Sequence, residues 1–565
     1  MKRYIILPAI ALYCLTSCSD FLDQDPLDSF TEVAVWEDPA LAESYLNEQY
    51  THLFSEFQKG VMYANFSDEA YHMHGYGTTV VTQGLLSPDS PNLAWNDDMY
   101  NNPWNLNYGY IKDINLFMEK IDQIPAKTEE EIDWRQEMKG QGYFLRAWFY
   151  SELYRHYGSV PLITHTYGLH DDFFNTVREP MDKVAEYITS QCDSASNLLP
   201  TRYSDAKDFG RATKGAALAL KARTLLYAAS PLFGTPSSEK WEKAAAANKA
   251  VIELKDESGA EVYHLAQANS AEEYADMFVD KMNPEVILMK MFDKQGQGIG
   301  NDSFTHQAPA GPGSGFEGWS TIQPSQKVVD AFQNADGTDY VRTSDTENPY
   351  KDREWRFYAA VFYDGATWGY GESKREVQMY VSGEEGVTGG LDSNEGPNWW
   401  NGTQTGYNMR KFLDKNFDTY GTESNNTPWF FFRLSEFYLN YAECLIELGK
   451  TGEALKYIND IRARVNLPAT TADNLKEKYK HERMVELVFE GHRWFDLRRW
   501  KEAETVLNED IYGIKILKFK DGSKKYELKT DPCQVRTFIA PQNYWLPIPR
   551  EELRKAPQLD PTPYN

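Results

Sequence analysis

The sequence has little cysteine, fewer basic than acidic residues, and no long apolar run after its first fifteen residues. Of its 5 Cys among 565 residues, Cys14 and Cys18 lie near the N-terminus, and Cys192, Cys444 and Cys533 are widely spaced. This spacing excludes a disulfide framework and a cysteine metal cluster. The 58 Lys and Arg are outnumbered by 84 Asp and Glu, a formal net charge of −26. Because no basic stripe offsets this charge, we predict no nucleic-acid partner.

Aromatic residues, by contrast, are abundant. They make up 14% of the chain, with 15 Trp, 36 Tyr and 29 Phe. Disordered chains are poor in aromatic residues, and a chain of this length can bury a large core. We therefore expect a globular protein, and the question is which rings pack inside it and which serve another purpose.

The first eighteen residues predict export and lipidation. Lys2 and Arg3 precede an apolar stretch that ends at Leu15 and is shorter than the roughly 20 residues of a bilayer span. Small residues then precede Cys18, as in a bacterial lipobox. We predict a signal peptide over 1–17, lipidation of Cys18, and a lipidated acidic tether over 18–30, with two or three acyl chains giving a stable anchor. The alternative is an ordinary signal peptide with a chance Cys.

Apolar periodicity predicts a chain that is helical at both ends and irregular in between. Helical spacing covers 37–59, 105–124, 132–157, 178–199, 212–230 and 241–255. About half of the 37 Gly fall in 296–421, where we expect loops and short strands. Such loops, laid on a rigid scaffold, are where binding usually resides.

Helices are predicted to return at Phe431 and to continue through 453–465. Small and large residues there fit the spacing of one tetratricopeptide unit, namely Ala442, Leu445, Gly449, Ala454 and Ile458. Further strands are predicted at 514–520 and 525–529.

One string near the C-terminus is the most specific in the chain. It reads Phe489-Glu490-Gly491-His492-Arg493-Trp494-Phe495-Asp496-Leu497-Arg498-Arg499-Trp500. Weaker strings lie at 142–147, 157–162, 221–228 and 546–549. Together with the lipobox and the Asp-rich start, they resemble the SusD/RagB family of outer-membrane nutrient-binding lipoproteins, over essentially the whole chain.

The resemblance implies a mostly α fold, with a tetratricopeptide-like helix-pair scaffold, an irregular loop-rich ligand-binding face and a few short strands. It implies an N-terminal SusD-like helical part over 31–290 and a C-terminal SusD/RagB part over 291–565, both in one compact unit. It also implies a place on the outer membrane, lipid-anchored and facing the cell exterior, and a SusC/RagA-like TonB-dependent transporter as partner. Family members bind oligosaccharides or, in some cases, peptides.

Two clusters of polar residues could suggest other chemistry. Glu486 and Glu490 lie one turn apart, as a glycosidase would require, but neighbouring arginines would lower their pKa values and make them poor general acids. We therefore predict structural ion pairs and no enzyme. His72 and His74 lack a third metal ligand in register, so we interpret them as surface residues and predict no metal site and no cofactor.

Aromatic residues in loops are the candidate ligand platforms, because a flat ring matches the C–H face of a sugar. Trp399 and Trp400, between Pro397 and Gly402, cannot easily both turn inward. Trp355 and Trp429 are assigned to packing. The resemblance adds Asp68 as a polar candidate near the ligand face. The predicted ligand-binding set is Asp68, Trp95, Asn96, Phe316, Trp319, Trp368, Tyr370, Trp399 and Trp400.

These patterns predict a cell-surface glycan-binding lipoprotein that captures oligosaccharides and delivers them to its transporter. Two alternatives stay open. One is a peptide- or glycopeptide-binding member of the same family, and the other is a purely protein-interacting helical-repeat lipoprotein.

Overall fold

The computed structural model describes residues 32–57, 60–94, 102–168, 170–292, 307–310, 318–369, 374–415, 426–560 and 563–564. The long helices are α3 (Pro39–Thr51), α5 (Pro103–Lys120), α6 (Glu129–Tyr157), α7 (Met181–Leu198), α8 (Lys214–Ala229), α9 (Ser238–Ile252), α14 (Leu434–Glu447), α15 (Thr451–Ala463) and α16 (Leu475–Glu486). No helix in this part of the chain combines the length and the apolar character that crossing a bilayer requires.

Local sequence signals fix where the longest helix begins and ends. The side chain of Thr128 accepts from the backbone N–H of Glu131 at the start of α6, and the Glu131 carboxylate accepts in return from the N–H of Thr128. This reciprocal cap satisfies two N–H groups that have no partner within the helix. Gly158 follows the last turn at φ 70°, a conformation that costs glycine little.

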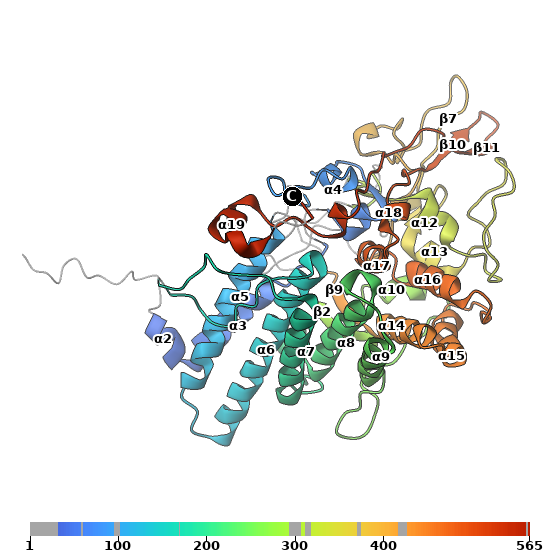
Figure 1. The fold of residues 1–565 in the computed structure, drawn as a ribbon. Coiled ribbons are helices and arrows are strands. Elements are labelled where there is room, and N and C mark those ends of the chain that lie inside the picture. The colour runs from blue at the N-terminus through green and yellow to red at the C-terminus, as the bar shows by residue number, and fades with distance from the viewer. Residues whose placement is uncertain are drawn as a thin grey trace, which may run out of the picture.

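The long helices form one stack in which successive helices pack side by side (Figure 1). α5 packs on α6, α6 on α7, α7 on α8, α8 on α9, α9 on α14 and α14 on α15. Small residues allow the close approach, since a Cβ on Gly142 of α6 would lie 2.5 Å from the Met118 sulfur of α5. The predicted helical hairpin is confirmed, because Ala442 of α14 and Ala454 and Ile458 of α15 are fully buried where the two helices meet.

A two-stranded sheet joins two segments that are distant in the sequence. β2 (Val286–Lys290) pairs antiparallel with β9 (Trp429–Arg433), whose five residues are all buried. The prediction that a helix starts at Phe431 is therefore wrong, and α14 begins only at Leu434. The predicted packing role of Trp429 is confirmed, since its ring is 4% exposed.

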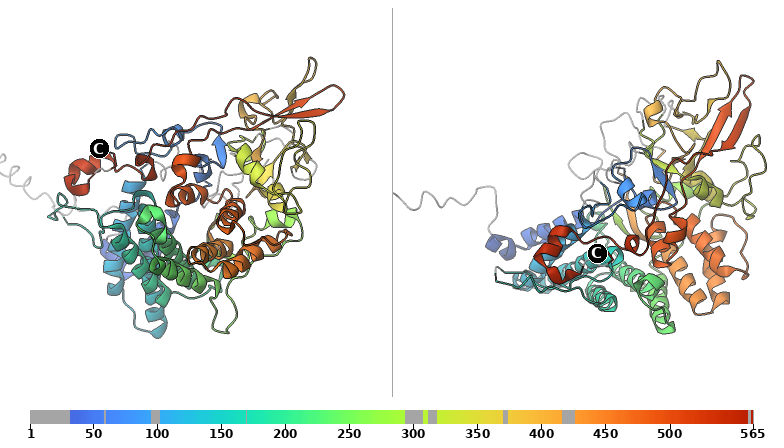
Figure 2. Two further views of the ribbon diagram at one scale, coloured as in Figure 1. Left: turned by 45° about the vertical axis from the view of Figure 1, so that its right-hand side comes forward. Right: turned by 45° about the horizontal axis from the view of Figure 1, so that its top comes forward.

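The remaining strands are short and lie above the helix stack. They are β1 (Ala70–His72) with β3 (Ile322–Pro324), β4 (Val361–Phe362) with β8 (Asn408–Met409), β5 (Thr367–Trp368) with β6 (Arg375–Glu376), and β7 (Val381–Ser382) with β10 (Ile514–Lys518) and β11 (Lys524–Leu528). Figures 1 and 2 show β7, β10 and β11 projecting from the end of the molecule opposite the tips of the long helices. The mostly helical fold with few short strands is thus as predicted.

Two local predictions are corrected. The helix predicted over 37–59 is shorter, because α3 ends at Thr51 and Leu53 to Phe57 are buried in an irregular segment. His72 is not a surface residue. It is 1% exposed, because β1 is covered through its pairing with β3, from which it is about 250 residues distant in sequence.

Candidate functional site

Trp399 and Trp400 form an exposed aromatic pair on the irregular face. They lie in a single 3₁₀ turn, η7 (Trp399–Asn401). Trp399 is 62% exposed and Trp400 48% exposed. Their ring centroids are 6.0 Å apart and their planes stand at 85°. Two adjacent large apolar rings facing water are uncommon on a folded protein, and such a patch is typical of a binding site.

The turn that carries the pair is fixed on both sides. The Asn398 amide, which is buried, donates to the carbonyl of Ala310 at 2.9 Å. Gly402 donates its N–H to the carbonyl of Trp399 at 3.2 Å. A Cβ on Gly402 would lie 2.1 Å from the carbonyl oxygen of Ser393, so only glycine fits there without rearrangement.

A buried ion pair also supports this turn. Asp392, fully buried, accepts from both terminal nitrogens of Arg375 at 2.7 Å and from the N–H of Gln378 at 2.9 Å. Its carbonyl accepts from the N–H of Thr403 at 3.0 Å. A bidentate pair fixes the relative orientation of its two residues and is also stronger than a single bond. The loop from 375 to 403 is therefore anchored on both sides of the two rings.

A second aromatic group is built around Trp319, which is 36% exposed. His74 Nε2 lies 3.1 Å from the Trp319 carbonyl, and the two rings meet edge to face at 6.1 Å. Burial lowers the pKa of His74, so the ring is neutral at pH 7. Because a carbonyl can only accept, Nε2 carries the proton and Nδ1 is an acceptor.

The segment that presents His74 has an unusual backbone. Gly75, Tyr76 and Gly77 have φ values of 76°, 37° and 83°. A left-handed conformation costs a non-glycine residue such as Tyr76 on the order of 1–2 kcal/mol. It turns the Tyr76 ring onto His74, with a centroid distance of 5.8 Å and an angle of 27°. The sequence analysis named Trp319 but missed His74 and Tyr76 as its neighbours, although two glycines flanking a tyrosine were a usable signal.

One short segment links the two aromatic groups. Ala310 binds Asn398, as described above, and the carbonyl of Ala308 accepts from the N–H of Ser320, next to Trp319, at 3.2 Å. A Cβ on Gly318 would lie 2.0 Å from that same carbonyl. We call the set Trp319, His74, Tyr76, Trp399 and Trp400 the aromatic face.

Asp68 lies two residues before β1 and is not free to bind a ligand. It is 3% exposed. Its carboxylate accepts two hydrogen bonds from Arg493, at 2.8 and 3.0 Å, and lies 3.3 Å from the ammonium of Lys327. Burial favours the neutral acid, but the two cations outweigh it and lower the pKa of Asp68 to about 2. Its carboxylate is thus committed to Arg493, a residue of the family-like string.

The other predicted platforms divide into two groups. Trp368 is 8% exposed and packs edge to face on Phe362 at 4.8 Å, so it offers little ring surface to a ligand. The rest lie outside the described residues, namely Trp95, Asn96, Phe316 and Tyr370. Trp355 is partly buried against the core, as predicted.

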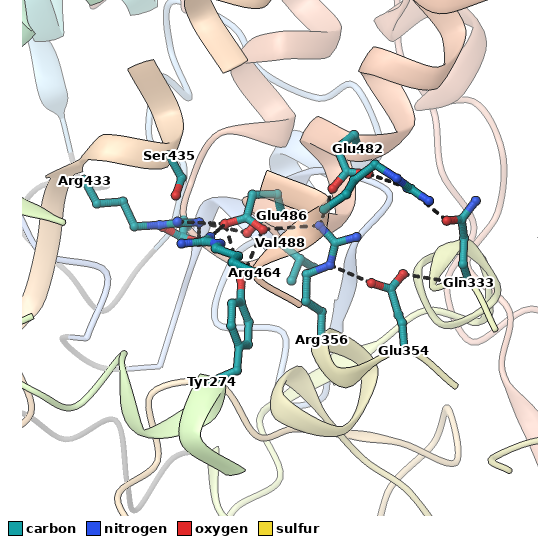
Figure 3. Close-up of polar contacts among 12 residues, drawn as sticks. Tyr274, Gln333, Glu354, Arg356, Arg433, Ser435, Arg464, Glu482, Glu486 and Val488 are labelled. Atoms are coloured by element: carbon teal, nitrogen blue, oxygen red, sulfur yellow. Dashed lines mark hydrogen bonds and ion pairs between the residues drawn. The ribbon is translucent and has the colours of Figure 1, made fainter. Parts of the chain in front are cut away.

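The carboxylates that resembled a catalytic pair belong to a buried ion-pair network, and Figure 3 shows its part around Glu486. Glu486 accepts from Arg433 at 2.8 Å, from Arg356 at 3.2 Å and also from Arg464. Glu490 accepts from Arg433 and from the ammonium of Lys411, each at 2.6 Å. The predicted structural ion pairing of both residues is confirmed.

These surroundings decide the protonation of the network. Burial alone would raise the pKa of Glu486, but three guanidinium groups reverse this and hold the pKa well below its usual range. The pKa of Glu490 is lowered by Arg433 and Lys411 despite burial. Groups that stay ionised and enclosed in this way are poor proton donors.

A groove that the sequence did not indicate lies beside α5. Its volume is about 540 Å³, and it is lined mainly by apolar and aromatic side chains from α5, the segment 161–176 and α19 (Arg550–Lys555). Trp104, Tyr108 and Tyr167 line it, and Phe173 at its edge is 47% exposed. It is separate in sequence from the residues of the aromatic face.

Sequence comparison matches two family models to this chain. The model of the SusD family covers residues 284–564, and a model described as starch-binding associating with outer membrane covers residues 20–226. A SusD-like protein of Formosa agariphila is 23% identical over 529 residues, covering 88% of this chain and 91% of that protein. Another from the same organism is 23% identical over 99% of both chains.

Solved structures have the same fold. A SusD-like protein of Bacteroides fragilis superposes with a TM-score of 0.78 at 25% identity, over 95% of this chain and 99% of the other. A SusD-like carbohydrate-binding protein of Bacteroides fragilis gives a TM-score of 0.73 at 23% identity, over 93% and 99%. A laminarin-binding SusD-like protein gives 0.63 at 21%, over 94% and 100%. With two family models spread along the chain and relatives that match nearly its full length, the chain belongs to the SusD/RagB family.

Proposed function

We propose that this protein is a non-catalytic glycan-binding lipoprotein of the cell surface, which captures oligosaccharides at the aromatic face and delivers them to a SusC-like TonB-dependent transporter. The observation that carries the proposal is the exposed Trp399–Trp400 pair on a turn held by Asn398 and Asp392. Rings that stay in water on a rigid support are ready to stack on a sugar without a cost of ordering.

The comparisons support a carbohydrate ligand. One matching family model is described as starch-binding and associated with the outer membrane. Structures with the same fold include a carbohydrate-binding protein of Bacteroides fragilis and surface glycan-binding proteins of Bacteroides fluxus and Bacteroides uniformis. The charge of −26 does not oppose a neutral glycan, whereas it would repel a polyanion.

The charged network supports binding rather than hydrolysis. The paired carboxylates are enclosed by cations, and Glu486 is fully buried. A glycosidase needs one carboxyl that can donate a proton to the leaving oxygen. The full chain should therefore bind an oligosaccharide saturably and release no reducing ends on prolonged incubation. Release of reducing ends, with loss of that activity in Glu490→Gln, would contradict the proposal.

Attachment and transport are tested separately. Replacing Cys18 by Ser should release the protein from outer-membrane vesicles, because its acyl chains supply the anchor. Co-purification with a transporter of the SusC class should depend on neither Trp399 nor Trp400, since these residues are assigned to the sugar. Retention of Cys18→Ser on membranes, in cells lacking any such transporter, would contradict the lipid anchor.

A further inference from the structure

A pocket of about 520 Å³ lies where the end of α6, the start of α7, the short helix α18 (Ala503–Val506) and the segment 540–548 meet. The residues that line it include Tyr157, Arg178, Lys501, Glu504, Tyr544 and Trp545, and we call it the α18 pocket. It has no residue in common with the aromatic face. Its volume is typical of sites that bind small molecules.

A buried arginine next to the α18 pocket has no carboxylate partner. Arg493 and Arg499, its neighbours in the family-like string, each pair with a buried carboxylate. Arg498 is 1% exposed and meets no carboxylate within ion-pair distance in the described part of the chain. It donates to the carbonyl of Tyr544, and its guanidinium lies 4.1 Å from the centre of the Trp494 ring. Burial lowers the pKa of Arg498 to about 10. A buried cation without a counter-charge is unfavourable, so negative charge bound beside Tyr544 would stabilise it.

The walls of the pocket carry two further cations, Arg178 and Lys501, and one carboxylate, that of Glu504. The Arg178 guanidinium lies 4.0 Å from the carboxylate of Asp560, which is too far for a hydrogen bond. Lys501 is exposed, and no carboxylate of the described residues lies within ion-pair distance of its ammonium. The buried hydroxyl of Tyr544 adds a donor, because its proton has no acceptor among those residues. On a chain with a net charge of −26, such a wall is an exception that attracts an anion.

Lys501 occupies a backbone position that favours glycine. It follows α17 (Arg493–Arg499) and has a φ of 61°. Its N–H donates to the carbonyl of Arg498 at 3.0 Å, and the N–H of Glu502 donates to the carbonyl of Leu497 at 2.8 Å. In this helix-ending turn the left-handed residue is usually glycine, since a side chain there costs stability. The turn therefore does not explain the lysine, whereas an anionic ligand does.

We propose that the α18 pocket is a second binding site, which takes a short oligosaccharide that carries a carboxylate, as the uronic acid sugars do. Arg178 and Lys501 bind the carboxylate, since a guanidinium fits its planar shape, and the partly exposed ring of Trp545 contacts the sugar. The choice of a sugar as the carrier of the charge rests on the proposed glycan-binding function. None of the lining residues belongs to a strand, so the pocket offers no sheet edge to an extended acidic peptide.

The experiment is isothermal titration of the full chain with the trimers of galacturonic acid and of glucuronic acid and with their methyl esters. Esterification removes the charge and leaves the sugar chain unchanged, so each ester is the matched control of its acid. We expect at least one acid trimer to bind about tenfold more tightly than its ester at low salt, as for a hydrogen bond to a charged group. This ratio should shrink as the ionic strength rises.

Lys501→Gly is the most informative variant, because it removes the ammonium and suits the backbone better than lysine does. It should lower the acid-to-ester ratio several-fold while the melting temperature stays the same or rises. Arg178→Gln should lower the ratio by a similar factor. The control is Lys351→Gln, which removes an exposed lysine, also without an ion pair among the described residues, from outside the pocket. It should leave the ratio unchanged.

A neutral oligosaccharide that binds the wild-type protein is titrated alongside, so that the two proposals can fail separately. If it binds but neither acid exceeds its ester, or if Lys351→Gln lowers the ratio as much as Lys501→Gly, glycan binding stands and the second site is overturned. If the acid preference is lost in Trp399→Ala, Trp400→Ala and kept in Lys501→Gly, the acid binds the aromatic face and the second site is likewise overturned.

Two further outcomes concern the nature of the ligand. A preference for an acid trimer that depends on Lys501, with no neutral oligosaccharide bound, supports the second site and contradicts glycan capture at the aromatic face. Binding of a glutamate-rich peptide, but of neither uronic acid trimer, overturns the sugar as the ligand of the pocket.

Discussion

The Arg–Glu network and the aromatic face both gather functional side chains, but those of the network are buried and those of the face are exposed to water. In the network, Arg356, Arg433 and Glu486 are at most 3% exposed and each has charged partners. On the aromatic face, Trp399 and Trp400 remain in water. Both regions first suggest activity from the sequence alone. The difference teaches that clustering of chemical groups indicates function only when the groups are left accessible.

Their supports also differ in range. The network joins residues distant in sequence, with Arg356 from the central segment reaching Glu482 on α16 at 2.5 Å. The aromatic pair is held by a local turn, by the nearby Asp392 and by one longer-range bond, from Asn398 to Ala310. The network therefore stabilises the whole fold, whereas the turn affects one surface, and the two can be disrupted independently.

The largest expected effect is on the network. Glu486→Ala should destabilise the protein by about 3–5 kcal/mol, because it leaves several buried cations without their partner. The free energy of unfolding from urea titration measures this. The control is Glu239→Ala, which removes an exposed ion pair with Lys243 on α9. A loss for Glu486→Ala no larger than that of the control would contradict a structural role for the network.

A smaller effect concerns a buried acid without such pairing. Burial raises the pKa of Glu56 to about 8 from an ordinary value of 4.5, although it accepts from the N–H of Tyr63 at 2.6 Å. Between these pH values the folded chain holds a proton that the unfolded chain has lost, so stability falls as pH rises from about 4.5 to 8. Glu56→Gln should flatten this fall, because a glutamine side chain does not titrate.

Glu443 is the contrasting case. Arg499 outweighs burial and lowers its pKa to about 2. Its contribution is present above pH 4.5 and is lost as the pH falls towards 2. Glu443 is ionised at both pH 5 and pH 8, but urea titrations at these pH values also span Glu69, whose pKa burial raises to about 8. The share of Glu56 is therefore the part of the stability difference that Glu56→Gln removes. An unchanged difference between the two pH values in Glu56→Gln would contradict the assignment to Glu56.

The smallest expected effect is on the support of the aromatic pair. Asn398→Ala removes the bond to Ala310 and should loosen the turn, weakening glycan binding by a few-fold with about 1 kcal/mol of stability lost. Asn248→Ala is a matched control, since Asn248 is also a buried asparagine whose amide donates to one backbone carbonyl, that of Ala244 in α9, away from the aromatic face. Equal loss of affinity in both variants would show that the turn has no special role.

Most of the long helices could be predicted from the sequence to within a few residues, because helical periodicity and caps are local. The predicted 132–157 and 241–255 correspond to Glu129–Tyr157 and Ser238–Ile252. β9 could not, since a strand buried on both faces lacks a period of two and its partner β2 lies roughly 140 residues earlier in the chain. In the sequence, the apolar residues of β9 therefore resemble the start of a helix.

The candidate site was predictable only in part. Trp399 and Trp400 are adjacent in a glycine-flanked loop, so their exposure followed from local sequence. The position of Asp68 depends on Arg493, which lies 425 residues away, and that of His72 on the pairing of β1 with β3. Long-range contacts of this kind decide whether a polar residue faces a ligand or a partner within the fold.

Glycan binding at the Trp399–Trp400 pair is tested most directly with the double variant Trp399→Ala, Trp400→Ala. An oligosaccharide that binds the wild-type protein is titrated into this variant, and the variant's thermal melt is recorded. We expect the affinity for the oligosaccharide to fall by about a hundredfold, roughly one factor of ten for each ring. The melting temperature should stay within about 2 °C of wild type, as for exposed substitutions. Unchanged affinity, or a loss of affinity that accompanies a large loss of stability, would contradict it.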